Sequence, residues 1–109
     1  MASKIVRITM FKLPSKEDQK KLLGLYKTLS ETATKDGKPY ILSLAAGPAY
    51  DDVRSQGFTL VARSEFKDLE DMKFYDDGCE AHQELKKGVK TLNNEGVMTV
   101  YYTPEVVKD

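Results

Sequence analysis

Hydrophobic and polar residues recur along the chain with two different periods, which separate strands from helices. Four short runs are rich in β-branched, aromatic and other apolar residues, as expected of strands. They cover residues 5–13, 40–46, 58–66 and 97–103. After the first and third runs, apolar residues recur at helical spacing with charged residues opposite. The predicted order is therefore strand, helix, strand, strand, helix, strand.

Capping residues predict where the two helical segments begin. Ser15 and Asp68 each precede such a segment, and each has an acidic residue three positions later, as in a capping box. Residues 76–78 read Asp-Asp-Gly and predict a break in the second helix. Beyond the break, we expect Asp77 to cap the continuation, with Glu80 at the third position.

This order of elements is typical of an α+β, ferredoxin-like β-α-β-β-α-β fold. Right-handed crossovers then place both helices on one face of a four-stranded antiparallel sheet. A chain of 109 residues suits one compact unit, so we expect a single domain over residues 1–109.

The uncovered face of this sheet predicts a dimer. A face exposed to water should be polar, because two helices can cover only the other face. Apolar residues nevertheless occupy both faces of the strands. In the first strand, Val6, Ile8 and Met10 lie opposite Ile5, Phe11 and Leu13, and in the last strand Met98 and Val100 lie opposite Val97 and Tyr101. An exposed apolar face is normally a contact surface, and two-fold pairing of two sheets gives a dimeric α/β barrel. The alternative is a monomer with a mildly apolar sheet face.

Composition and charge exclude several other kinds of protein. Seventeen Lys and Arg balance seventeen Asp and Glu, so the basic surplus of a nucleic-acid or anionic-lipid binder is missing. No apolar run approaches the roughly 20 residues that span a membrane. The start, Met1 to Ile5, lacks a secretory pattern, and Cys79 is the lone cysteine. We therefore expect a cytoplasmic protein that binds neither nucleic acid nor membrane.

Several short segments, taken in order, carry a family resemblance. The opening IVRITMFKL, the EAHQEL of residues 80–85 and the VMTVYYTP of residues 97–104 are similar to motifs of the stress-responsive A/B barrel domain (Dabb) family. The resemblance covers nearly the whole chain, and its helical segment is closer to fungal than to plant members. It implies the ferredoxin-like fold and a homodimer, while most members have no assigned reaction.

A distant plant relative, olivetolic acid cyclase, closes a linear polyketide by intramolecular aldol condensation without a cofactor. Its catalytic histidine matches His82, and a tyrosine on the same helix lies near the place of Tyr75. Two departures matter. The histidine usual in the first strand is Arg7 here. Tyr75 also lies seven rather than six residues before His82, in a different helical phase unless the break at Gly78 shifts it.

His82 and Tyr75 are the candidate catalytic residues. His82, the only histidine, has an ordinary pKa near ~6.5 and can act as a general base. His82 lies on the apolar stripe of its helix and therefore points inward. The alternative to a general base is a core histidine whose ring forms a hydrogen bond with a backbone carbonyl. Tyr75 can donate a hydrogen bond to a developing enolate oxygen, or it is an amphipathic core residue with its hydroxyl at the surface.

Arg7 places a charge inside an apolar strand, and such a charge needs a partner. It binds a carboxylate or enolate oxygen of a ligand, pairs with Glu65 or Glu80, or lies at a strand edge. These alternatives stay open from the sequence.

Together with Arg7, three further residues are assigned to a candidate ligand pocket between sheet and helices: Thr9, Tyr26 and Cys79. Cys79 lies three residues before His82, so the two side chains can share a helical face. A nucleophilic pair or half of a metal site is possible there, and a free reduced thiol is the alternative. Because no other Cys or His is present to complete a zinc site, we expect no metal. The resemblance to a cyclase that works without a cofactor implies that no cofactor is bound either.

Three functions fit these observations. The protein binds a small hydrophobic or polyketide-like ligand without chemistry, or it is a cofactor-free polyketide cyclase or lyase with His82 as base, or it is a structural dimer or oligomer. A cavity that both His82 and Arg7 reach favours the first two. A filled core in which His82 bonds to the backbone favours the third.

Overall fold

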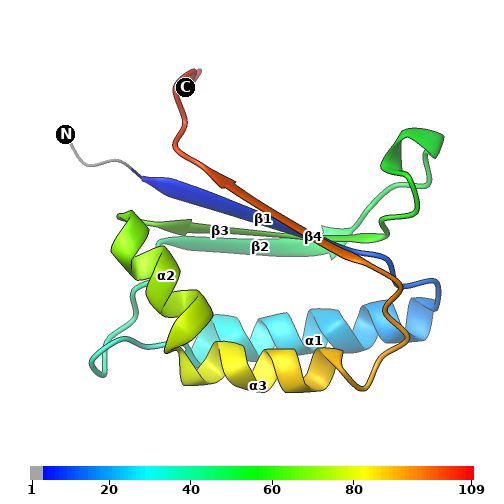
Figure 1. Ribbon diagram of the computed structural model, residues 1–109, viewed down its shortest axis with the longest axis horizontal. Coiled ribbons are helices and arrows are strands. Elements are labelled where there is room, and N and C mark those ends of the chain that lie inside the picture. Colours follow the sequence, from blue (N-terminus) through cyan, green and yellow to red (C-terminus); the bar gives the residue numbers. More distant parts are fainter. Residues whose placement is uncertain (1–3) are drawn as a thin grey trace.

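The computed structural model describes residues 4–109, so most of the start used to judge a secretory pattern lies outside the described residues. The elements are β1 (Ile5–Phe11), α1 (Lys16–Thr32), β2 (Ser43–Pro48), the 3-10 turn η1 (Val53–Ser55), β3 (Leu60–Phe66), α2 (Leu69–Asp77), α3 (Glu80–Val89) and β4 (Val97–Tyr102). The strands form an antiparallel sheet in the order β2-β3-β1-β4. The helices α1, α2 and α3 lie on one side of it (Figure 1). This is the predicted ferredoxin-like α+β fold.

The second strand begins later than the sequence pattern indicates. Residues 40–46 predict it, whereas β2 spans Ser43–Pro48. The ring of Tyr40 packs against the rings of Phe66 and Phe74 instead, with centroids 6.0 and 5.2 Å apart. The apolar start of that run therefore fills the core before the chain enters the sheet. The other strands lie within their predicted ranges.

The predicted break of the second helical segment occurs at Gly78, but the expected cap is wrong. Asp77 is the last residue of α2, and Cys79 is the N-cap of α3 without a side-chain hydrogen bond. The amides of Gly78 and Cys79 both donate to the carbonyl oxygen of Phe74, at 2.7 and 3.0 Å. These two bonds close α2 beyond Asp77, so Asp77 does not begin the next helix.

The core lies between the sheet and the helices. Ser15 and Asp68 begin α1 and α2 as predicted, because each side chain accepts a hydrogen bond from the amide three residues later. Inward-facing residues of β1 and β3 meet the buried faces of the helices. The apolar part of this core includes Ile5, Phe11, Leu22, Leu29, Leu60, Phe66, Met72 and Leu85.

The opposite face of the sheet is apolar and uncovered, as the alternation predicts. On β1, Val6, Ile8 and Met10 pair with Tyr102, Val100 and Met98 of β4, respectively. The three β4 residues are 47%, 48% and 46% exposed. Figure 1 shows that no helix packs on this face. Among residues 4–109, no helix is both long enough and apolar enough to cross a membrane.

Candidate functional site

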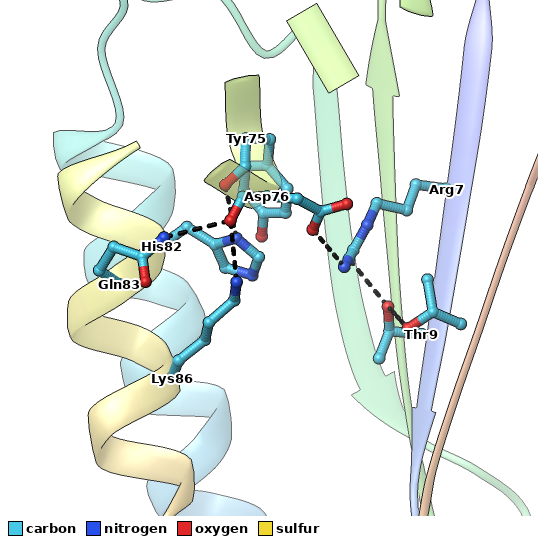
Figure 2. Close-up of polar contacts among 8 residues, drawn as sticks. Arg7, Thr9, Tyr75, Asp76, His82, Gln83 and Lys86 are labelled. Carbon is cyan, nitrogen blue, oxygen red and sulfur yellow. Dashed lines mark hydrogen bonds and ion pairs between the residues drawn. The ribbon is translucent and has the colours of Figure 1, made fainter. Parts of the chain in front are cut away.

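The break between α2 and α3 brings Tyr75 and His82 into contact. His82 lies seven positions after Tyr75, which in an unbroken helix would leave them about 10 Å apart along the axis. With the break at Gly78, the two rings stack with centroids 3.7 Å apart and planes 14° apart. Figure 2 shows His82 on α3 reaching the end of α2. The difference in helical phase that the sequence shows is therefore removed by the break.

The hydrogen bond of His82 determines its tautomer. Its Nδ1 atom lies 2.7 Å from the backbone carbonyl oxygen of Tyr75 (Figure 2). A carbonyl oxygen can only accept, so Nδ1 carries the proton and donates it. No hydrogen-bond partner for Nε2 is found among residues 4–109. The lone pair of Nε2 is therefore the free proton acceptor of this ring.

Burial keeps the candidate catalytic groups neutral. His82 is 3% exposed, and desolvation lowers its pKa to about 4, an effect that the nearby Arg7 and Lys86 charges strengthen. Burial also raises the pKa of the Tyr26 hydroxyl to about 12 and that of Tyr75 well above its ordinary value. At pH 7 the site thus holds a neutral imidazole and two protonated phenols.

Arg7 lies on the central part of the sheet and is 9% exposed. Its Nη1 donates to Thr9 Oγ1 at 2.8 Å, and its Nη2 donates to Asp76 Oδ1 at 2.9 Å. The edge position and the pairing with Glu65 or Glu80 are wrong. Glu65 is opposite Val6 in the register, so it lies on the other face and pairs with Arg63 there. Glu80 is exposed at the start of α3.

A small gap lies beside Arg7 in the core. It is too narrow to admit a water molecule. Its lining consists of Arg7, Tyr26, Leu44, Ala62, Arg63, Ser64 and Tyr75. Ser64, which the sequence pattern does not single out, is the polar inward-facing residue of β3 opposite Arg7. The structure therefore joins three of the predicted site residues, Arg7, Tyr26 and Tyr75, around one gap.

The other predicted site residues do not line this gap. Thr9 is hydrogen-bonded to Arg7 and lies 3.0 Å from the hydroxyl of Thr99. His82 contacts the gap only through the ring of Tyr75, which the Arg7 guanidinium also approaches at 5.1 Å. Cys79 is fully buried in the apolar core. Within residues 4–109, no group of three or more His, Cys, Asp or Glu is placed to hold a metal ion.

Asp76 is the site residue that sequence reasoning misses, because the pattern assigns it only to the helix break. Its carboxylate pairs with Arg7, and its backbone carbonyl accepts from Gln83 Nε2 at 3.2 Å and Lys86 Nζ at 3.0 Å (Figure 2). Side chains of α3 thus hold the end of α2. A usable signal is the charge of Arg7, which needs a carboxylate, together with the position of Asp76 beside Tyr75.

Solved structures with similar folds span nearly the whole chain. Hydroxynitrile lyase from Passiflora edulis superposes with a TM-score of 0.77 and 16% identity, covering 99% of this chain and 100% of that one. A dimeric ferredoxin-like protein from Thermobifida fusca gives 0.75 and 10%, covering 95% and 93%. SnoaB, a cofactor-independent oxygenase from Streptomyces nogalater, gives 0.68 and 8%, with 97% of each chain covered. At these identities the likeness shows the fold.

Similarity in sequence is more specific. A protein of Gibberella zeae described as a fusaristatin A biosynthesis cluster protein is 42% identical over 105 residues, which cover 96% of this chain and 76% of that protein. The family model of the stress responsive A/B barrel domain matches residues 5–102. The chain therefore belongs to the stress-responsive A/B barrel domain family.

Proposed function

We propose that the protein binds a small, polyketide-like carbonyl compound between its sheet and helices, and that His82 removes a proton from the carbon next to the carbonyl. The observation that carries this proposal is the state of His82. The residue is buried, neutral and fixed as the Nδ1–H tautomer, with the lone pair of Nε2 free. A general base needs such a lone pair within hydrogen-bond reach of the proton that it removes.

The proposed step moves one proton and one electron pair. Nε2 takes the proton from carbon, and the electron pair moves to the carbonyl oxygen, which becomes an enolate. The hydroxyl of Tyr75 stays protonated at neutral pH, since burial raises its pKa, and it donates a hydrogen bond to that oxygen. The enolate carbon then attacks a second carbonyl of the same molecule, whose oxygen takes the proton from the His82 imidazolium, or the enolate carbon takes that proton back. No cofactor enters this sequence of steps.

The low pKa of His82 determines how strong a base it is in this step. A base with a pKa of about 4 is weak at neutral pH, because a catalytic pKa works best near the working pH. An enolate next to the ring favours the imidazolium and raises this pKa. The base thus becomes stronger as the negative charge develops beside it.

Relatives support a role with small molecules. The 42% identical protein of Gibberella zeae is described as part of a biosynthesis cluster. Two proteins with this fold are described as a hydroxynitrile lyase and a cofactor-independent oxygenase. The descriptions support chemistry on a small organic molecule, and that of the oxygenase supports chemistry without a cofactor. The substrate of this chain is left to experiment.

A structural role for His82 is the second candidate, and two observations favour it. The core beside His82 is filled, since the gap next to Arg7 admits no water molecule and does not reach His82, and Nδ1 of His82 bonds to the backbone of Tyr75. This bond, with those of Gln83 and Lys86 to Asp76, fixes α3 against the end of α2. A protein whose His82 serves only this purpose is a dimeric scaffold without chemistry. The two candidates differ in what happens when Nε2 is removed and the donor at Nδ1 is kept.

We also propose that the protein is a homodimer that pairs through the uncovered sheet face. The half-exposed residues Met98, Val100 and Tyr102 support this assembly, as do neighbours described as dimeric ferredoxin-like proteins. The candidate site is on the opposite, helix-covered face, so pairing leaves it free to bind a ligand. A single domain over residues 1–109 and a cytoplasmic location stay predictions from the sequence.

The exchange of α-protons for deuterium tests the proposed base. With 2-tetralone in D₂O, an aromatic ketone with exchangeable α-protons, the protein should accelerate exchange above the buffer rate. His82→Asn keeps an N–H donor near the position of Nδ1 but has no counterpart of Nε2. It should lower the rate at least about 100-fold, the usual contribution of a general base. Proton NMR follows the loss of the α-proton signal.

Controls separate chemistry from folding in this assay. Lys87→Asn changes an exposed residue of the same helix and should leave the rate unaltered. For the unaltered protein, kcat/KM should be level at neutral pH and fall as the pH drops through about 4, where His82 is protonated. Equal rates for His82→Asn and the unaltered protein would support the scaffold instead, and exchange no faster than in buffer would refute the proposed base.

A further inference from the structure

The hydrogen bonding of Arg7 is incomplete on one edge. Its Nε atom is buried and has no partner among residues 4–109. The neighbouring Nη2 contacts a single oxygen, Oδ1 of Asp76, at 2.9 Å. A guanidinium presents Nε and Nη2 side by side, a spacing that matches the two oxygens of one carboxylate. Asp76 thus fills half of a two-point carboxylate site.

The two partners of Arg7 differ in how firmly they are held. Thr9 is buried on β1 itself and bonds to Nη1, on the other side of the guanidinium. The side chain of Asp76 is 36% exposed at the last turn of α2, so it can turn into water at little desolvation cost. A buried N–H without a partner is energetically unfavourable, and a carboxylate that contacts both Nε and Nη2 removes that cost.

We propose that Arg7 recognises a carboxylate of the ligand and that Asp76 occupies part of this position while the site is empty. The inference rests on the proposed function, because it names the substrate class of the same site. The ligand carboxylate binds Nε and Nη2 and displaces Asp76 into solvent. The walls of the adjoining gap carry the hydroxyl side chains of Tyr26, Ser64 and Tyr75.

The position of Arg7 relative to the candidate base defines the substrate further. The ring of Tyr75 contacts both the guanidinium of Arg7 and the ring of His82. The ring of Tyr75 thus separates the gap beside Arg7 from His82, so a molecule bound through its carboxylate at Arg7 reaches the base only when this ring moves aside. The proposed substrate class is a keto acid, in which the carboxylate anchors the molecule and the carbonyl lies near the base.

An acid and its methyl ester test this inference, because they differ in charge at one end only. We choose 4-hydroxybenzoate and methyl 4-hydroxybenzoate as probes, since aromatic rings line the site. The acid should bind at least about tenfold more tightly than the ester, by roughly 1.4 kcal/mol. In ¹H–¹⁵N spectra the Nε–H signal of Arg7 should shift with the acid and stay in place with the ester. Arg7→Gln identifies that signal.

Variants distinguish recognition by Arg7 from a general effect of charge. Arg7→Gln should bind the acid no better than the ester. Asp76→Asn removes the competing charge, so it should bind the acid about tenfold more tightly than the unaltered chain, as expected for loss of an internal competitor. Asp77→Asn and Arg54→Gln alter a neighbouring acid and an exposed arginine, and both should leave the affinity of the acid unchanged.

Three results would overturn the inference. They are equal affinity of acid and ester, an Asp76→Asn affinity equal to that of Asp77→Asn, and no binding of the acid to Asp76→Asn at millimolar concentration. The outcome is independent of the proposed base. His82→Asn should keep the preference for acid over ester, so a failed deuterium exchange with an intact preference refutes proton transfer alone. Exchange without the preference refutes the carboxylate site alone.

Discussion

Val100→Asp should leave the protein monomeric at micromolar concentrations where the unaltered chain is a dimer. Val100 lies on β4 opposite Ile8, in the uncovered apolar face. Pairing of two such faces would bury the new carboxylate without a partner, and burying an unpaired charge is strongly unfavourable. We expect the dimer to weaken at least about 100-fold, on the order of 3 kcal/mol. Sedimentation velocity over a range of concentrations measures the shift.

The monomer itself should tolerate this change. Val100 is 48% exposed in the single chain, so an aspartate there meets water rather than core. Val53→Asp is the matched control, because Val53 is 93% exposed in the turn η1, away from the sheet, and its variant should dimerise normally. Circular dichroism should be the same for both variants. A monomeric unaltered protein, or a fully dimeric Val100→Asp, would contradict the proposed interface.

Lowering the pH from 6.5 to 4 should remove about 3 kcal/mol of stability that His82→Asn does not lose. His82 has its pKa lowered from 6.5 to about 4 by burial, so between these values the unfolded chain binds a proton that the folded chain excludes. The stabilising contribution is complete above pH 6.5 and is lost progressively as the pH falls towards 4. Below that value both states carry the proton.

Urea unfolding at pH 7.0 and pH 4.0 measures this difference. The carboxylates of the protein also titrate in this range, and the comparison with His82→Asn cancels their contribution. Both proteins must be studied at one protomer concentration, because dimerisation adds to apparent stability. At pH 7 the variant should be the less stable of the two, and the gap should nearly close at pH 4. A gap independent of pH would show that His82 titrates normally.

The fold follows from periodicity because its signals are local and repeated. The alternation in β1, the helical spacing in α1 and the caps at Ser15 and Asp68 each agree with the structure. The predicted start of the second strand is wrong because Tyr40 packs its ring into the core instead of pairing in the sheet. Periodicity cannot distinguish a residue that packs in the core from one that pairs in a strand. Asp77 fails as a cap because the hydrogen bonds that close a helix depend on geometry at Gly78.

The candidate site was accessible from the sequence only in part. The apolar stripe correctly predicts that His82 points inward, and alternation places Arg7 and Thr9 on the helix-covered face. The partner of Arg7 was not accessible, since Asp76 comes close only through the break between α2 and α3. The tautomer of His82 likewise depends on one carbonyl of the preceding helix. Such contacts between consecutive elements require coordinates.

Strand β1 separates the candidate site from the proposed dimer interface. Its odd-numbered residues, Arg7 and Thr9, point to the candidate site, and Val6 and Ile8 point to the proposed dimer partner. A strand that is paired on both sides, with the proposed dimer partner packed on one of its faces, has little freedom to move. Any opening that admits a ligand must therefore come from the helical side, where Gly78 and Cys79 alone connect α2 to α3. Changes in sequence at this two-residue junction are therefore expected to affect ligand access without disturbing the proposed assembly.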